Sequence, residues 1–127
     1  MSCLCKLCLC RVALAVASSG IAATLTPGAR TAHSRHSIPA KGLTAESTCP
    51  GMKANRDCVL RQLEEMSVLN TWDEITMTHR WAIEALNRSL QDVLDCDDKV
   101  FGGKVFVFCG DFRQVPPPDL HFLPAHY

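Results

Sequence analysis

The 127 residues carry 13 basic and 13 acidic side chains, so the formal net charge is zero, and 47% of the residues are hydrophobic. This balance argues against intrinsic disorder, and no run approaches the ~20 apolar residues of a membrane span. The charge is unevenly divided, since residues 1–61 have a balance of +6 and residues 62–127 a balance of −6. A basic half suits phosphates and an acidic half suits a cation, although uneven solvated surfaces explain the division equally well.

Half of the eight cysteines lie in the first ten residues, and these are Cys3, Cys5, Cys8 and Cys10. Together with Lys6 and Arg11 before an apolar run, they leave open a secretory signal followed by a disulfide-bonded protein. Residues 18–20 interrupt the apolar run after six residues, which disfavours that alternative. Zinc binding is disfavoured because the cluster has no second, distant cysteine pair. We treat residues 1–11 as a Cys-rich segment of unclear origin with free thiols.

The apolar run at residues 12–17 predicts a first strand, buried on both faces as in a parallel sheet. Ser18 or Ser19 is placed to cap a helix that Pro27-Gly28 would end. Residues 30–52 combine prolines and glycines with His, Ser and Thr clusters, so they are predicted to form a loop.

The second part of the chain alternates again between helix and strand. Helical spacing at residues 58–66 is followed by a predicted strand at residues 67–72. Asn70 and Thr71 are unusually polar for a central strand, and burying them unpartnered would cost about 1–3 kcal/mol each. A helix is predicted over residues 77–94, with an apolar face formed by Ile83, Leu86, Leu90, Val93 and Leu94. A turn at residues 101–103 and a strand at residues 104–109 complete the order expected of an α/β fold with a parallel sheet.

Polar residues follow each predicted strand, at residues 18–20, 73–74 and 110–114. Ligands gather at the carboxyl ends of the strands in an open parallel sheet. Asp73-Glu74 suits a magnesium ligand followed by a base that polarises water, although acidic residues at a helix start explain the pair about as often. Gln114 could sense the γ-phosphate and Arg113 could pair with a phosphate. The alternative is that both residues belong to an exposed turn before three prolines.

Three segments closely resemble, in order, motifs Ia, II and III of Pif-type helicases, particularly those encoded by Helitron transposons. The matching residues are Val16–Thr24 with Pro27-Gly28 and Arg30–Arg35, then Trp72–Glu74 with Met77–Arg80 and Glu84–Leu86, then Phe101–Val105 and Gly110–Val115. The resemblance runs from about residue 12 to residue 118, which leaves residues 119–127 as a divergent tail.

The resemblance implies a partial RecA-like P-loop NTPase domain of superfamily one. It implies ATP-dependent, 5′-to-3′ translocation on single-stranded DNA and unwinding at duplex junctions, in recombination, repair or transposition and in the nucleus or mitochondrion. Asp73 would hold Mg²⁺ through water, Glu74 would activate the attacking water, and Gln114 would contact the γ-phosphate of ATP. Arg113 with Asp111 would link the nucleotide to motion. The residues implied to contact the DNA strand are Ser18, Ser19, Thr24, Thr31 and His33.

The main departure from the family is that no Gly-rich loop ending in Gly-Lys-Ser/Thr occurs in these 127 residues. We therefore expect an inactive fragment that does not hydrolyse ATP by itself, with a non-catalytic strand-binding or interaction module as the alternative function. His36 is expected to be a surface or packing residue, and Trp72 and Trp81 are expected to be core aromatics.

Overall fold

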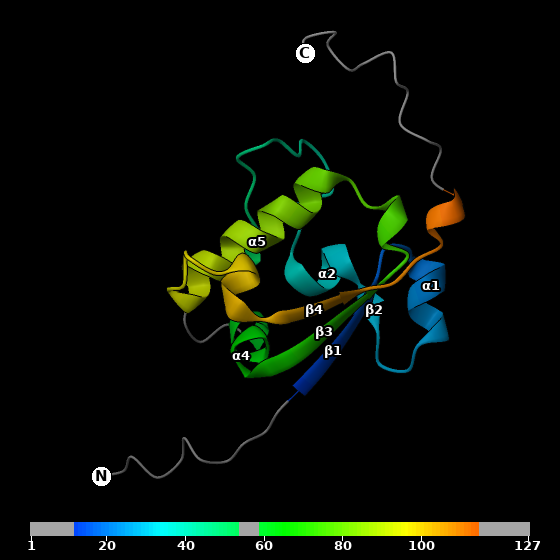
Figure 1. Ribbon diagram of the computed structural model, residues 1–127, viewed down its shortest axis with the longest axis horizontal. Coiled ribbons are helices and arrows are strands. Elements are labelled where there is room, and N and C mark those ends of the chain that lie inside the picture. Colours follow the sequence, from blue (N-terminus) through cyan, green and yellow to red (C-terminus); the bar gives the residue numbers. More distant parts are fainter. Residues whose placement is uncertain (1–11, 54–58, 115–127) are drawn as a thin grey trace, which may run out of the picture.

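The computed structural model describes residues 12–53 and 59–114, which form a parallel sheet with helices packed against it (Figure 1). The strands are β1 (Val12–Ala17), β2 (Arg30–Thr31), β3 (Ser67–Asp73) and β4 (Val105–Phe108). The α-helices are α1 (Gly20–Leu25), α2 (Ala32–His36), α3 (Pro50–Lys53), α4 (Val59–Met66) and α5 (Arg80–Leu94). Three short 3₁₀ turns are η2 (Ile75–Met77), η3 (Val100–Gly103) and η4 (Phe112–Gln114).

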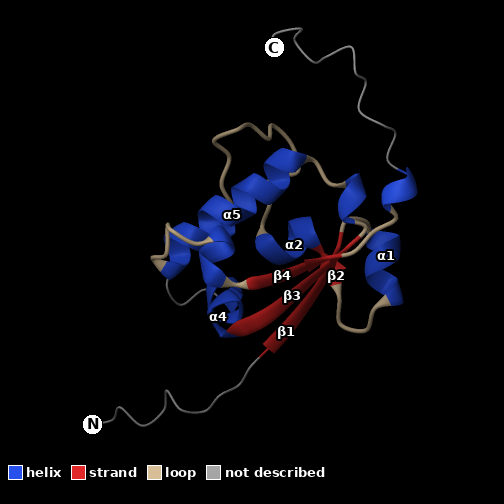
Figure 2. Cartoon of the chain, in the orientation of Figure 1, coloured by secondary structure: helices blue, strands red, loops and turns tan. Residues whose placement is uncertain are grey.

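The sheet has the strand order β2-β1-β3-β4, and every neighbouring pair is parallel. The predicted α/β class with a parallel sheet is therefore confirmed. Because all four strands run the same way, their carboxyl ends meet at one edge of the sheet, beside α1 (Figure 2). This edge carries the polar residues that follow β1, β3 and β4.

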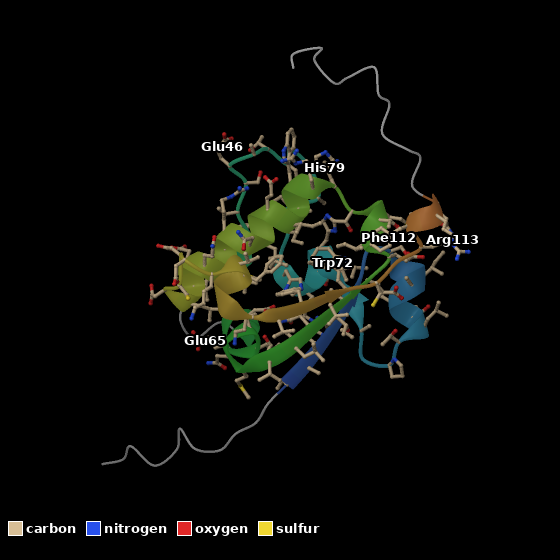
Figure 3. The ribbon with its side chains drawn as sticks, viewed as in Figure 1. Glu46, Glu65, Trp72, His79, Phe112 and Arg113 are labelled. Carbon is tan, nitrogen blue, oxygen red and sulfur yellow. The ribbon has the colours of Figure 1, made fainter. Side chains whose placement is uncertain are left out.

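One face of the sheet is covered by α2, α3 and α5, and the core lies between them. Trp72 of β3 is fully buried at the centre of this layer (Figure 3). Helix α5 buries Leu86, Leu90 and Val93 of its predicted apolar face, whereas Ile83 and Leu94 of that face are half-buried. The buried members of this core are Val16, Ala32, Ile38, Cys49, Met52, Trp72, Ile75, Ala82, Ala85, Leu86, Leu90, Val93 and Phe101.

Among residues 12–53 and 59–114, the buried residues on the opposite face of the sheet lie at its carboxyl end, where α1 packs Ala22 and Ala23 against Ala17 of β1. Ala13 on the same face of β1 is exposed, and so are Val105 and Val107 of β4. The prediction that residues 12–17 are buried on both faces is therefore wrong for the described residues. An uninterrupted apolar run does not reveal which face a helix covers, because burial depends on segments elsewhere in the sequence.

The prediction of a loop over residues 30–52 is wrong at both ends and holds for residues 37–49. The segment contains β2, α2 and the start of α3. Strand β2 has only two residues and α2 only five, so neither is long enough to show a hydrophobic period. Their order comes instead from pairing with β1 and from Thr31, whose hydroxyl accepts a hydrogen bond from the Ser34 amide at 3.4 Å.

Helix α5 begins at Arg80, three residues later than the sequence predicts. Residues 75–77 form η2 instead, and His79 caps α5 by accepting the Trp81 amide on its Nδ1 at 3.2 Å. The ring of Trp81 is half-buried and lies 4.9 Å from the His79 ring, so Trp81 is less enclosed than the predicted core aromatic. Trp72 matches that prediction.

Five polar side chains are buried among the described residues, namely His36, Glu64, Ser67, Asn70 and Ser89. His36 Nδ1 lies 2.7 Å from Glu64 Oε1, and both side chains are almost fully enclosed, which makes His36 a packing residue. The Asn70 amide donates to Ser67 Oγ at 3.3 Å, while its carbonyl oxygen has no hydrogen-bond partner among residues 12–53 and 59–114. The expected cost of a polar β3 is therefore only partly offset.

Three parts of the sequence lie outside the described residues. These are the predicted Cys-rich segment at residues 1–11, Pro116–Pro118, and the tail at residues 119–127. Within the described part of the chain, no helix is long and apolar enough to cross a membrane.

Candidate functional site

The ends of β1 and β3 lie side by side at the carboxyl edge of the sheet. Ala17 pairs with Asp73 in the parallel register, and the Ser18 amide donates to the Asp73 carbonyl at 3.1 Å. Ser18-Ser19 is thereby placed against Asp73-Glu74, although the two pairs are 55 residues apart in sequence. We call these four residues together with Thr78 the β1–β3 cluster.

Ser18 links this cluster to the hydrophobic core. Its hydroxyl accepts a hydrogen bond from Trp72 Nε1 at 3.0 Å and lies 2.5 Å from the Thr78 hydroxyl. Because Trp72 is fully buried, Ser18 satisfies the indole N–H that the core would otherwise leave unpaired. The cluster is thus anchored directly to the hydrophobic core.

Ser19 connects the start of α1 to the carboxylate that follows β3. Its hydroxyl donates to Glu74 Oε2 at 2.9 Å and accepts the Ala22 amide at 3.1 Å, which makes it the N-cap of α1. Of the two serines proposed from sequence as the cap, Ser19 fills that place. Glu74 itself has a positive φ of 53°, and its amide donates to Asp73 Oδ1 at 2.9 Å.

The two acidic side chains of the cluster are half-buried and offer oxygen ligands. Among residues 12–53 and 59–114, no three His, Cys, Asp or Glu side chains group closely enough to hold a metal ion by themselves. Mg²⁺ commonly takes only one or two carboxylates and completes its octahedron with water and substrate phosphate oxygens. The donor set therefore fits magnesium brought with a nucleotide.

The third polar segment follows β4 and is arranged differently. The Cys109 amide donates to the Trp72 carbonyl at 2.8 Å, and the Ile75 amide donates to the Cys109 carbonyl at 3.0 Å, so the chain leaves the sheet beside η2. Beyond it, Asp111 accepts the Arg113 amide at 3.0 Å and the Gln114 side-chain amide at 3.3 Å. We call Asp111, Arg113 and Gln114 the β4–η4 cluster.

The β4–η4 cluster lies on the surface. All three of its side chains are exposed, and Figure 3 shows Arg113 at the edge of the molecule beside α1. In the part of the chain that is described, no hydrogen bond joins Arg113 or Gln114 to Asp73 or Glu74. The structure thus unites the predicted residues that follow β1 and β3, and leaves the predicted Arg113 and Gln114 bonded only within their own turn.

The remaining residues predicted to contact DNA lie on α1, β2 and α2. The Thr24 hydroxyl is exposed and donates to the Ile21 carbonyl at 2.6 Å, Thr31 caps α2, and His33 is half-buried. Arg30 beside them is exposed. Their roles at a DNA strand stay predictions, because the geometry places them without showing a contact.

Sequence reasoning gave no role to Thr78 and expected Trp72 only to pack. Both side chains bind the Ser18 hydroxyl. In the sequence, Trp72 comes directly before the Asp73-Glu74 pair and Thr78 comes after it. A β-strand followed by a short turn does not reveal which later side chain folds back over the strand end. Only the tertiary structure could identify Thr78.

The family model described as PIF1-like helicase matches residues 8–119, which is most of the chain. The chain belongs to the PIF1-like helicase family. It is 39% identical over 102 residues to an ATP-dependent DNA helicase Pif1 of Psychrobacter sp. (strain PRwf-1), a match that covers 80% of this chain and 15% of the relative.

Solved Pif1 structures share the fold. Bacteroides sp. Pif1 in complex with ADP-AlF4 superposes with a TM-score of 0.69 at 28% identity, covering 86% of this chain and 24% of the other. Bacteroides Pif1 bound to single-stranded DNA gives a TM-score of 0.67 at 28% identity, covering 83% and 24%. The chain therefore spans about a quarter of the length of these structures and 15% of the curated relative.

Proposed function

We propose that these residues form part of the motor domain of an ATP-dependent DNA helicase. The observation that carries the proposal is the contact between the strand-end serines and the Asp73-Glu74 pair. It places a carboxylate pair suited to Mg²⁺ and water beside two serine hydroxyls, at the edge where parallel sheets bind ligands. The solved relative in complex with ADP-AlF4 supports nucleotide use at such a fold.

Within this proposal, Asp73 and Glu74 divide the work at the nucleotide. Asp73 has one carboxylate oxygen bonded to the Glu74 amide and a second that can hold a water of the magnesium shell. Magnesium bound with ATP neutralises charge on the phosphates. Glu74 orients and polarises the attacking water, and Gln114 with Arg113 contacts the γ-phosphate side once η4 is brought over it.

The DNA partner is proposed from the serine and threonine hydroxyls around α1 and α2. Hydroxyl and backbone donors position a phosphate backbone without selecting bases, which suits a motor that moves along any sequence. The Bacteroides relative bound to single-stranded DNA supports a strand as the track. We extend the proposal to 5′-to-3′ movement, to unwinding at duplex junctions, and to recombination, repair or transposition in the nucleus or mitochondrion.

The proposal is tested by ATP hydrolysis in the full reading frame that contains these residues. With magnesium and poly-dT we expect DNA-stimulated turnover that Glu74→Gln reduces by about 10²–10⁴-fold, the usual contribution of a general base. Glu84→Gln, on the exposed side of α5, is the matched control and should turn over normally. A Glu74→Gln protein as active as the wild type would contradict the proposal.

A second function is favoured for the 127 residues alone, since they contain no Gly-Lys-Ser/Thr loop. We propose that they bind single-stranded DNA weakly and do not hydrolyse ATP. Fluorescence anisotropy with an oligo-dT should show salt-sensitive binding, and Arg30→Ala should lower the affinity and reduce the salt slope by about one. Magnesium-dependent, DNA-stimulated hydrolysis by the 127 residues would contradict this second proposal.

A further inference from the structure

His36 and Glu64 form a buried pair whose polar atoms are only half satisfied. His36 Nδ1 lies 2.7 Å from Glu64 Oε1, and the two side chains are 0% and 1% exposed. The second polar atoms, His36 Nε2 and Glu64 Oε2, have no hydrogen-bond partner among residues 12–53 and 59–114. Taking such a pair out of water costs about as much as the contact returns, so apolar side chains of similar volume often give equal or greater stability. The pair is therefore a poor source of stability for the core.

The pair supplies a direction that an apolar contact does not. Helix α2 has five residues, and a helix of this length does not hold an orientation by itself. Its other buried side chain is Ala32, whose methyl group makes a small and non-directional contact. The hydrogen bond from His36 to Glu64 therefore sets how α2 is turned on the sheet face that it shares with α5 (Figure 1).

Glu64 is itself tied to strand β3. The Ser67 hydroxyl donates to the Glu64 carbonyl at 2.9 Å, and the Asn70 amide donates to Ser67 Oγ at 3.3 Å. Ser67 and Asn70 both belong to β3, and both side chains are buried. The His36 ring also lies 6.2 Å from the ring of Trp72, which anchors the β1–β3 cluster. The pair thus orients α2 relative to the strand that ends in the β1–β3 cluster.

We propose that His36 and Glu64 are positioning residues, which fix the orientation of α2 against β3 without adding stability. Thr31 and His33, at and inside α2, are two of the residues proposed to contact a DNA strand. For these two residues the inference rests on the proposed function and deepens it. Side chains already held in one orientation lose less freedom when a ligand binds, so the pair strengthens strand binding.

The first test measures backbone amide exchange in the 127 residues, without DNA or nucleotide. In His36→Leu/Glu64→Met, apolar side chains of similar volume replace the pair. We expect a urea midpoint at least as high as that of the wild type. The amides of residues 34–38 should exchange at least about tenfold faster than in the wild type while those of α5 keep their rates, because only local opening at α2 changes.

Glu64→Gln is the matched variant for this measurement. Its amide group can accept from or donate to His36 Nδ1, so it removes the charge and keeps the directional hydrogen bond. The amides of α2 should then exchange at the wild-type rate. Wild-type exchange at α2 in the double variant would overturn the inference, because apolar contacts would then suffice to orient the helix. Loss of the fold, or faster exchange in α2 and α5 alike, would overturn it as well, because the pair would then stabilise the whole core.

The second test measures the affinity for oligo-dT by fluorescence anisotropy. The double variant should bind about tenfold more weakly than the wild type, and Glu64→Gln should stay within about twofold of it. If α2 exchanges faster and the affinity is unchanged, the role of the pair at the strand is overturned. If the wild type binds no oligo-dT, the proposed strand function fails, whereas amide exchange still decides whether the pair positions α2.

Discussion

The β1–β3 cluster and the β4–η4 cluster occupy the same edge of one sheet but are organised differently. Ser18, Ser19 and Asp73-Glu74 are bound to each other across two strands and through Trp72 to the core. Asp111, Arg113 and Gln114 are exposed and bound within three residues of sequence. The difference indicates that the β1–β3 cluster is held together by the fold of this chain, whereas the β4–η4 cluster is held only by hydrogen bonds within its own turn.

The largest expected effect is on the anchor of the β1–β3 cluster. Trp72→Ala removes a fully buried aromatic ring and should lower the free energy of unfolding by about 3–5 kcal/mol. Trp81→Ala, at a half-buried ring on α5, should cost clearly less. Urea unfolding monitored by circular dichroism checks both. Equal losses for the two variants would mean that Trp72 is not the anchor.

Cysteine labelling compares the exposed end of β4 with the core. Burial raises the pKa of the Cys49 thiol to about 11, whereas Cys109 is exposed before the β4–η4 cluster. At pH 8 the Cys49 thiolate is about 100-fold scarcer than that of an ordinary thiol, and the core shields it further. Iodoacetamide followed by peptide mass spectrometry should therefore modify Cys109 at least about 100 times faster. Similar rates would show that the core opens on the labelling timescale.

The third prediction isolates the hydrogen bond between Ser18 and Trp72. Ser18→Ala leaves the buried indole N–H unpaired and should cost about 1–3 kcal/mol of unfolding free energy. In Trp72→Phe, which lacks that N–H, the same Ser18→Ala change should cost less, and this double-mutant cycle measures the coupling. Ser34→Ala on the surface of α2 is the matched control. Additive losses would place the role of Ser18 elsewhere.

The smallest effect is expected at the β4–η4 cluster. Asp111→Ala removes two exposed hydrogen bonds within one turn and should change the unfolding free energy by no more than about 0.5 kcal/mol. Thermal or urea unfolding detects the change. A loss above about 1 kcal/mol would show that η4 is as integral to the fold as the β1–β3 cluster.

Much of the fold could be predicted because its signals are local. The strands at residues 12–17, 67–72 and 104–109 and the helices after the first two strands follow from apolar runs and periodicity, and each lies within a few residues of its predicted place. The pieces missed, β2 and α2, are too short to carry a period. They are held by pairing with β1 and by caps, which only the folded chain supplies.

The candidate site could likewise be predicted only in part from the sequence. That residues after β1 and β3 approach one another follows from a parallel sheet, whose strands end at a common edge. A parallel sheet does not predict three other contacts, which are those of Ser19 with Glu74, of Thr78 with Ser18, and of His36 with Glu64. Each of these contacts joins side chains 28 to 60 residues apart, and their geometry depends on packing angles that no local pattern records.

By itself the sequence determined the class of fold, the family and the residue types available for chemistry, because hydrophobic patterning and motif order are written along the chain. The tertiary structure decided which face of the sheet is covered, which serine caps α1, and which serine accepts the hydrogen bond of the Trp72 indole. Buried donors and acceptors at the strand ends must find hydrogen-bond partners. Those partners are brought together only when strands that are distant in sequence pair in the sheet.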